Sequence, residues 1–210
     1  MKRAILTGFE PFGPYEYNPV KDTAIEYHDT VIGDVEICGL VLPCTYHGAF
    51  DILSEKISQL SPDVILSTGL SSRVEKIRLE AIGKNIMNGK YADADGRKPD
   101  GEPIIPGGAE VYRTNANNGL LAILLYRSGI SAEVSFDAEG FICNSLLYLT
   151  AGRIREENLP IRHAFFHTPW TDDYLDRVHL EEGKVAIKKE DLRRAIEITI
   201  WHLGKCVKKD

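Results

Sequence analysis

The chain has 210 residues, of which 43% are hydrophobic and 27% are charged, and its formal net charge is −6. This composition is typical of a globular protein, and the length fits one large α/β domain better than two small ones. The acidic balance argues against a nucleic-acid partner and against binding to an anionic membrane, because both attract clusters of lysine and arginine.

The N-terminus and the cysteines bear on where the protein works. The opening sequence, MKRAILTGFEPFG, has an apolar run before Gly8 that is far shorter than a secretory or membrane-spanning segment. Cys38, Cys44, Cys143 and Cys206 form no CxxC pair and show no spacing typical of a zinc site or a disulfide framework. We therefore expect a protein of the reducing cytosol that holds no metal ion.

Short apolar runs alternate along the chain with segments whose apolar residues have helical spacing. In chain order we expect a strand at 3–7, a strand at 34–42, a helix at 46–60, a strand at 63–68, a helix at 119–127, a strand at 132–136, a helix at 141–148, a strand at 162–166 and a helix at 189–203. The turn-rich stretch 91–108 is expected to be a long loop. This alternation predicts a single domain over residues 1–210, a three-layer α/β/α sandwich with a mainly parallel, twisted central sheet.

Ligands of such sheets bind beyond the carboxyl ends of the strands. The segments that follow the predicted strands are 8–18, 68–73, 137–143 and 167–170, and all of them carry reactive or aromatic residues. We therefore expect these four loops to form one site.

Two of these loops carry a candidate cysteine nucleophile and its base. Cys143 lies near the start of a predicted helix, where backbone N–H groups and the helix dipole favour a thiolate. His167 ends a predicted strand and could act as its base. A third group must fix the histidine tautomer, and Glu80 lies on an alternating segment that could point it inward. Each residue alone has a plain structural explanation, so the hypothesis depends on the three together.

The order of these residues resembles the pyrrolidone-carboxylate peptidases, also called pyroglutamyl aminopeptidases. TGFEPFG followed by Asn18 and Pro19 resembles the N-terminal motif of that family, and segment 69–85 resembles its glutamate motif with Glu80 at the catalytic position. FFHTPW resembles the histidine motif around His167. The cysteine motif is matched by Ser135, Ala138, Phe141, Cys143 and Asn144. The resemblance runs over nearly the whole chain.

The resemblance implies a cysteine peptidase that removes N-terminal pyroglutamate from peptides without a cofactor, and it implies a homotetramer. It also implies a pocket for the neutral lactam ring, which needs apolar walls and partners for one N–H and one C=O group. The positions implied are Phe9, Phe12 and Phe141 for sandwiching the ring, and Asn18, Thr45 and Leu70 for positioning it.

Several positions depart from the family pattern. Lys90 stands where the family has an arginine that assists the oxyanion, and a lysine lacks the planar fork. Ala81 replaces a basic residue after Glu80, and Glu139 alters the pair before the nucleophile, where an inward carboxylate would raise the thiol pKa. Ser72 and Pro14 also replace glycines.

Two alternatives therefore stay open. One is a cysteine amidase of the same fold that acts on another small acyl group, and the other is a relative that binds pyroglutamyl ends without turnover. A dinucleotide-binding protein is not expected, because GFEPFG lacks the third glycine and the helix start of that fingerprint.

Overall fold

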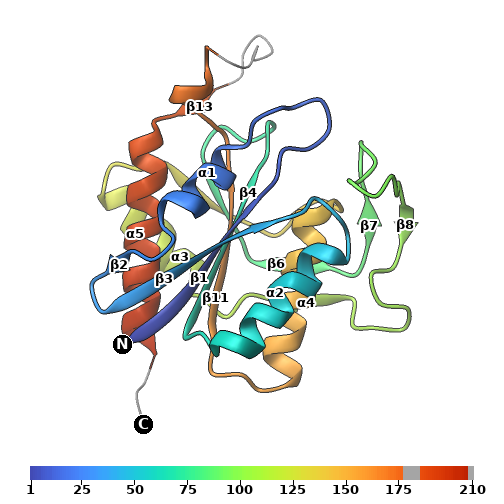
Figure 1. Ribbon diagram of the computed structural model, residues 1–210, viewed down its shortest axis with the longest axis horizontal. Coiled ribbons are helices and arrows are strands. Elements are labelled where there is room, and N and C mark those ends of the chain that lie inside the picture. Colours follow the sequence, from blue (N-terminus) through green and yellow to red (C-terminus); the bar gives the residue numbers. More distant parts are fainter. Residues whose placement is uncertain (177–184, 208–210) are drawn as a thin grey trace.

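The computed structural model describes residues 1–176 and 185–207, and a seven-stranded sheet lies at its centre (Figure 1). The strand order is β10-β5-β11-β4-β1-β3-β2. The strands are β1 (Lys2–Phe9), β2 (Val31–Ile32), β3 (Val35–Leu42), β4 (Val64–Leu70), β5 (Ile77–Glu80), β10 (Ala132–Ser135) and β11 (Arg162–Thr168). β1, β3, β4 and β11 run parallel to one another, whereas β2, β5 and β10 run the opposite way. The predicted mainly parallel α/β fold is therefore confirmed.

Helices cover both faces of the sheet (Figure 1). On one face lie α1 (Pro19–Glu26), α3 (Asn118–Arg127) and α5 (Lys189–Cys206), and on the other lie α2 (Gly48–Leu60) and α4 (Ile142–Glu156). Successive side chains of a strand point to opposite faces. Ile5 accordingly packs in the cluster with α2 and α4, whereas Ala4 and Leu6 pack in the cluster with α5. The sheet thus separates two apolar cores.

The directions of the edge strands correct part of the sequence argument. The rule about carboxyl ends assumed that the strand before Cys143 runs parallel to the strand before His167. β10 instead pairs with β5, and β5 runs antiparallel to β11. Cys143 reaches the site because segment 136–141 leads the chain from β10 to the start of α4.

The sequence analysis missed α1, which directly follows the first loop. Asn18 caps this helix by accepting a hydrogen bond from the Val20 N–H, and Pro19 occupies its first turn. The helix lies very close to β1, since a Cβ on Gly8 would lie 2.0 Å from the Val20 carbonyl oxygen. Only a glycine fits at this position, so Gly8, within β1, allows the close packing of α1 on the strand.

Short strand pairs support the walls of the site. They are β6 (Ile82–Lys84) with β9 (Val111–Arg113), β7 (Met87–Asn88) with β8 (Asp100–Glu102), and β12 (Trp170–Thr171) with β13 (Ala186–Ile187). The stretch 91–108, expected as one loop, contains β8 and is ordered by the buried Asp93. The Asp93 carboxylate accepts hydrogen bonds from the N–H groups of Tyr46, Asp95 and Arg97. No helix among the described residues is long and apolar enough to cross a membrane.

Candidate active site

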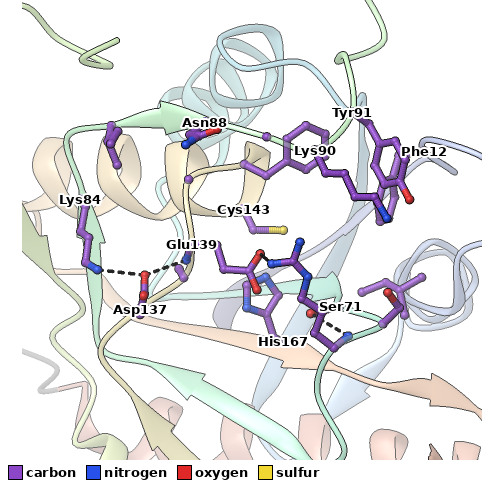
Figure 2. A pocket seen from close by; sticks show the side chains of 18 of the residues that line it. Phe12, Ser71, Lys84, Asn88, Lys90, Tyr91, Asp137, Glu139, Cys143 and His167 are labelled. Atoms are coloured by element: carbon purple, nitrogen blue, oxygen red, sulfur yellow. Dashed lines mark hydrogen bonds and ion pairs between the residues drawn. The ribbon is translucent and has the colours of Figure 1, made fainter. Parts of the chain in front are cut away.

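A cavity of about 740 Å³ lies beyond the ends of β4 and β11 (Figure 2). Its walls come from the loops after β1 and β4, from segment 84–91 and from segment 137–141 with the start of α4. The volume is within the range of small-molecule sites in proteins. Cys143 and His167 both line this cavity, so the structure brings together two residues that lie far apart in the sequence.

Cys143 lies in the first turn of α4. The preceding Phe141 is extended, and no side chain in the described part of the chain caps this helix end. The N–H groups of the first turn of a helix have no intrahelical acceptor, so they can donate to a ligand at the thiol. Gly69 on β4 leaves space for the thiol, because a Cβ at this position would lie 2.6 Å from the Cys143 Sγ.

His167 connects Cys143 to Glu80. The His167 ring is buried, and its Nδ1 lies 2.8 Å from the Glu80 Oε1. A Cβ added at Gly69, which would touch the Cys143 Sγ, would also lie 3.6 Å from the His167 Nε2. The Nε2 edge of the ring therefore faces the thiol. With Glu80 as acceptor at Nδ1, Nε2 is free to exchange a proton with Cys143.

The charges of this site favour a protonated histidine. Burial lowers the pKa of His167, but the charge of the Cys143 thiolate and its hydrogen bond, together with Glu80, outweigh burial and raise that pKa from 6.5 to about 10. A thiolate at Cys143 therefore favours the imidazolium form of His167, and a thiolate beside an imidazolium is the reactive form of a cysteine nucleophile.

Glu80 ends β5 and is fully buried, with 0% of its surface exposed. Its Oε1 faces His167, and its Oε2 has no hydrogen-bond partner among the described residues. The Arg78 Nε lies 3.5 Å from the same Oε1. The sequence analysis missed Arg78, although it lies two positions before Glu80 and hence on the same face of the strand.

Aromatic side chains form one side of the cavity. Phe12 and Phe141 line it, with ring centroids 6.0 Å apart, and Leu70 contributes a further apolar wall. Tyr15 packs edge-on against Phe12, and Tyr46 packs edge-on against Phe141 from behind. Tyr15 lines the cavity as well, and the sequence analysis did not identify it.

Three other residues expected in the pocket do not line this cavity. Phe9 is buried in the apolar core with α2 and α4. Asn18 is buried and caps α1, and its side-chain amide donates to the Glu10 carbonyl. Thr45 is buried, and its hydroxyl has no hydrogen-bond partner among the described residues.

Lys90 lies at the aromatic side of the cavity. Its ammonium is 5.2 Å from the centroid of the Tyr91 ring, within the range of a cation–π contact. Figure 2 shows the Lys90 side chain running toward Phe12, away from Cys143. In this arrangement the lysine contributes positive charge to the cavity without a direct contact to the thiol.

The carboxylate beside the nucleophile is paired. Glu139 lines the cavity, and its Oε2 lies 3.0 Å from the Arg73 Nη1. Its backbone φ is +63°, which is the left-handed region that favours glycine. Lys84 likewise pairs with Asp137 at 2.9 Å, and the hydrogen bond from Lys84 lowers the pKa of this aspartate. Neither acid at the cavity therefore faces Cys143 as an uncompensated charge.

No group of three or more His, Cys, Asp or Glu side chains in residues 1–176 and 185–207 is arranged to hold a metal ion. The cavity presents an imidazole and a thiol at the start of a helix and beside an apolar wall, and a buried carboxylate lies behind the imidazole.

Comparisons with known proteins match nearly the whole chain. A profile of the pyroglutamyl peptidase family matches residues 2–201. Pyrrolidone-carboxylate peptidase from Bacillus cereus strain B4264 is 29% identical over 200 residues, which is 95% of this chain and 92% of that protein. The counterpart from Bacillus mycoides strain KBAB4 is also 29% identical, with the same coverage of both chains.

Solved structures of two relatives superpose on nearly the whole chain. Pyrrolidone carboxyl peptidase from Thermococcus litoralis superposes with a TM-score of 0.91 at 28% identity, covering 100% of this chain and 99% of that one. The enzyme from Fervidobacterium islandicum AW-1 gives a TM-score of 0.90 at 27% identity, covering 98% and 99%.

Proposed function

The chain belongs to the pyroglutamyl peptidase family, and we propose that Cys143, His167 and Glu80 are the residues with which it works. As a member of this family it is a cysteine omega peptidase that removes N-terminal pyroglutamate from peptides. The observation that supports the assignment is the series of Glu80, His167 and Cys143, of which His167 and Cys143 line one cavity.

In the proposed acylation step the Cys143 thiolate attacks the carbonyl carbon of the pyroglutamyl residue. His167 then donates its Nε2 proton to the leaving amine, and the C–N bond breaks to give a thioester and a shorter peptide. Glu80 stays ionised and accepts from Nδ1, which keeps the correct tautomer in place.

In the deacylation step water attacks the thioester. His167 takes a proton from this water and keeps it while the C–S bond breaks and the Cys143 thiolate leaves, so that pyroglutamic acid and the original thiolate–imidazolium pair are formed. The oxyanion of both steps lies against the N–H groups at the start of α4, which have no side-chain cap among the described residues. Lys90 adds positive charge to the same cavity.

The substrate ring is proposed to lie against Phe12 and Phe141, with Leu70 beside it. These side chains offer apolar contact to a neutral lactam. The two acidic side chains that line the cavity, Glu139 and Asp137, are paired with Arg73 and Lys84. A free amino terminus would lack an acidic partner here. Phe9, Asn18 and Thr45 act in this proposal through the packing behind the wall, since they do not line the cavity.

The remaining expectations form part of the same proposal. Residues 1–210 make one catalytic domain, the protein works in the cytosol with its thiols reduced, and its chains assemble as a homotetramer. Gel filtration combined with light scattering tests the assembly, and a mass near that of a single chain would contradict it.

The test of the function compares pyroglutamyl, prolyl and alanyl chromogenic amides with the same leaving group. The prolyl amide lacks the lactam C=O and would leave its buried donor unpaired, which costs about 1–3 kcal/mol. We therefore expect kcat/KM for the prolyl amide to be roughly 5- to 150-fold lower than for the pyroglutamyl amide. Comparable values for the prolyl and pyroglutamyl amides would instead favour an amidase of broader specificity.

The same assay tests the nucleophile. Cys143→Ser is expected to abolish turnover, whereas Cys206→Ser, at an exposed thiol far along the sequence, serves as the matched control with unchanged activity. Full activity of the Cys143 variant would refute the mechanism. Binding of pyroglutamyl peptides by the wild type without turnover would select the non-catalytic alternative.

A further inference from the structure

We propose that Arg78 is a positioning residue that holds Glu80 as an ionised acceptor for His167, and so sets the pH range over which Cys143 reacts. The inference rests on the proposed roles of Cys143, His167 and Glu80. Arg78 does not itself line the cavity, so it would act through Glu80.

The sheet register places Arg78 beside the catalytic histidine. In the antiparallel pairing of β5 with β11, Arg78 lies directly opposite His167. Glu80 follows two positions later on β5, and residues two apart in a strand share a face. Cross-strand partners also share a face, so Arg78, Glu80 and His167 project from the sheet on the same side.

The contacts of Arg78 fix its guanidinium over Glu80. Its Nε lies 3.5 Å from the Glu80 Oε1, the oxygen that also accepts from His167. Its Nη2 donates to the Ser135 hydroxyl at 2.5 Å and to the Asp137 carbonyl at 3.1 Å. Ser135 is the parallel partner of Glu80 on β10, so these hydrogen bonds hold the guanidinium above the end of both strands. The arginine side chain is 21% exposed and hence largely ordered by these contacts.

The net negative charge of the three proposed catalytic groups calls for a cation beside Glu80. In the reactive form Cys143 and Glu80 each carry a negative charge and His167 carries a positive one, so the three groups together carry −1. Glu80 is 0% exposed, and a buried carboxylate without compensation is strongly disfavoured. Arg78 brings the sum to zero and lies within ion-pair distance of the buried acid.

The other charged groups around the site are engaged with each other. Glu133 on β10 lies 3.9 Å from Arg78 and pairs with Lys76 at 3.0 Å. At the cavity, Arg73 pairs with Glu139, and Lys84 pairs with Asp137. From α4 the group that faces His167 is Cys143. Arg78 is therefore the cation placed to act on Glu80.

Removal of this charge predicts a shift with a definite sign. In Arg78→Met the thiolate and the carboxylate lose an attracting cation, so more alkaline conditions are needed to form them and the acidic limb of kcat/KM rises. The imidazolium loses a repelling neighbour, so it keeps its proton to higher pH and the basic limb rises as well. Both limbs should move upward by about one pH unit, given the distance and the partial exposure of Arg78.

The experiment measures two pH profiles for each variant. The first is kcat/KM for a pyroglutamyl chromogenic amide, and the second is the rate of Cys143 alkylation by iodoacetamide, which needs no substrate turnover. Arg78→Met and the more polar Arg78→Gln should shift both profiles upward, and Arg78→Lys, which keeps the charge, should restore the wild-type positions. Lys76→Met removes an equal charge from the residue that directly precedes β5 and pairs with Glu133, and its profiles should not move.

The two readouts separate this inference from the proposed function. An enzyme that fails to hydrolyse the amide but whose Cys143 alkylation shifts in Arg78→Gln would contradict the function and retain the role of Arg78. Profiles of Arg78→Met and Arg78→Gln that superimpose on the wild type would overturn the inference, and any loss of thermal stability would then mark Arg78 as purely structural.

Discussion

The parallel centre of the sheet and its β5/β10 edge contribute to the site in different ways. Every residue of β4 is buried, as are all but the first residue of β11. β5 and β10 instead place Arg78, Glu80, Glu133 and Ser135 among their eight residues, and half of these eight are only partly buried. The apolar centre fixes where His167 and the Gly69 gap lie, whereas the polar edge supplies the charges that act on them. Position and electrostatics thus come from separate strands.

The largest effect should come from breaking the centre at Gly69. In Gly69→Ala the new Cβ would lie 2.6 Å from the Cys143 Sγ and 3.4 Å from the His167 Cδ2, so either the thiol or the ring must move. A displacement of this kind is expected to lower kcat/KM for a pyroglutamyl amide by about 100-fold or more. Gly119→Ala is the matched control, because its Cβ meets nothing closer than 3.6 Å and it lies in α3. Equal activity of the two variants would show that the Gly69 gap is not needed.

The central strands were also the part that the sequence predicted best. Their apolar runs are long enough to identify β1, β3, β4 and β11 within a few residues of their ends. The direction of β10 could not be predicted, because periodicity reports which side chains are buried and not which way a strand runs. α1 was missed because its eight residues form a short apolar stripe, although Asn18 and Pro19 are a start signal for a helix.

The candidate site was predictable where the chemistry depends on residue type. Cys143 and His167 were predicted from the reactive groups at the expected loops, Glu80 from its place on an alternating segment, and all three from the family resemblance. Phe9 and Thr45 were placed in the pocket by resemblance alone, yet neither lines the cavity, because one position along a strand or turn reverses the direction of a side chain. The ion pair of Arg73 with Glu139 joins two loops that are far apart in the sequence, and no local pattern reports such a contact.

β11 in the centre of the sheet carries a second histidine, His163, which, unlike His167, has no charged partner near its ring within the described part of the chain. His163 is 1% exposed, and neither ring nitrogen has a hydrogen-bond partner among the described residues. Burial lowers its pKa from 6.5 to about 3. The unfolded chain therefore binds a proton that the folded chain rejects, so stability is retained above pH 6.5 and is lost as the pH falls from there toward 3.

Replacement of this histidine isolates its contribution. Below pH 6.5 the protonation of His163 in the unfolded chain should lower the free energy of unfolding of the wild type by up to about 1.4 kcal/mol per pH unit. His163→Leu should remove this contribution, which is measured by comparing urea unfolding of the variant and the wild type at each pH. At pH 7 the two proteins should differ little, since no hydrogen bond of the ring is lost. Parallel stability curves for the two proteins from pH 7 to pH 4 would contradict a buried neutral His163.

The smallest effect concerns Glu139, at the polar side of the site. Its carboxylate lines the cavity but is paired with Arg73, and both side chains are substantially exposed, at 39% and 61%. Glu139→Gly leaves Arg73 without its partner, which favours the thiolate, so the acidic limb of kcat/KM should fall by a few tenths of a pH unit, roughly the scale of screened surface charges. Glycine also relieves the left-handed φ of +63°. The relief is partly offset by the larger entropy of glycine in the unfolded chain, so the stability should rise by less than about 1 kcal/mol.

A double-mutant cycle shows whether the Glu139 pair acts as one unit. Arg73→Met alone leaves Glu139 facing the cavity without its cation, so the acidic limb should rise. Arg73→Met combined with Glu139→Gly should return the limb to its wild-type position, because the two opposite charges are removed together. A fall of a full pH unit in the Glu139→Gly variant would mean that its carboxylate acts on Cys143 directly. The charge control assigned to the β5/β10 edge would then extend to the loop that precedes α4.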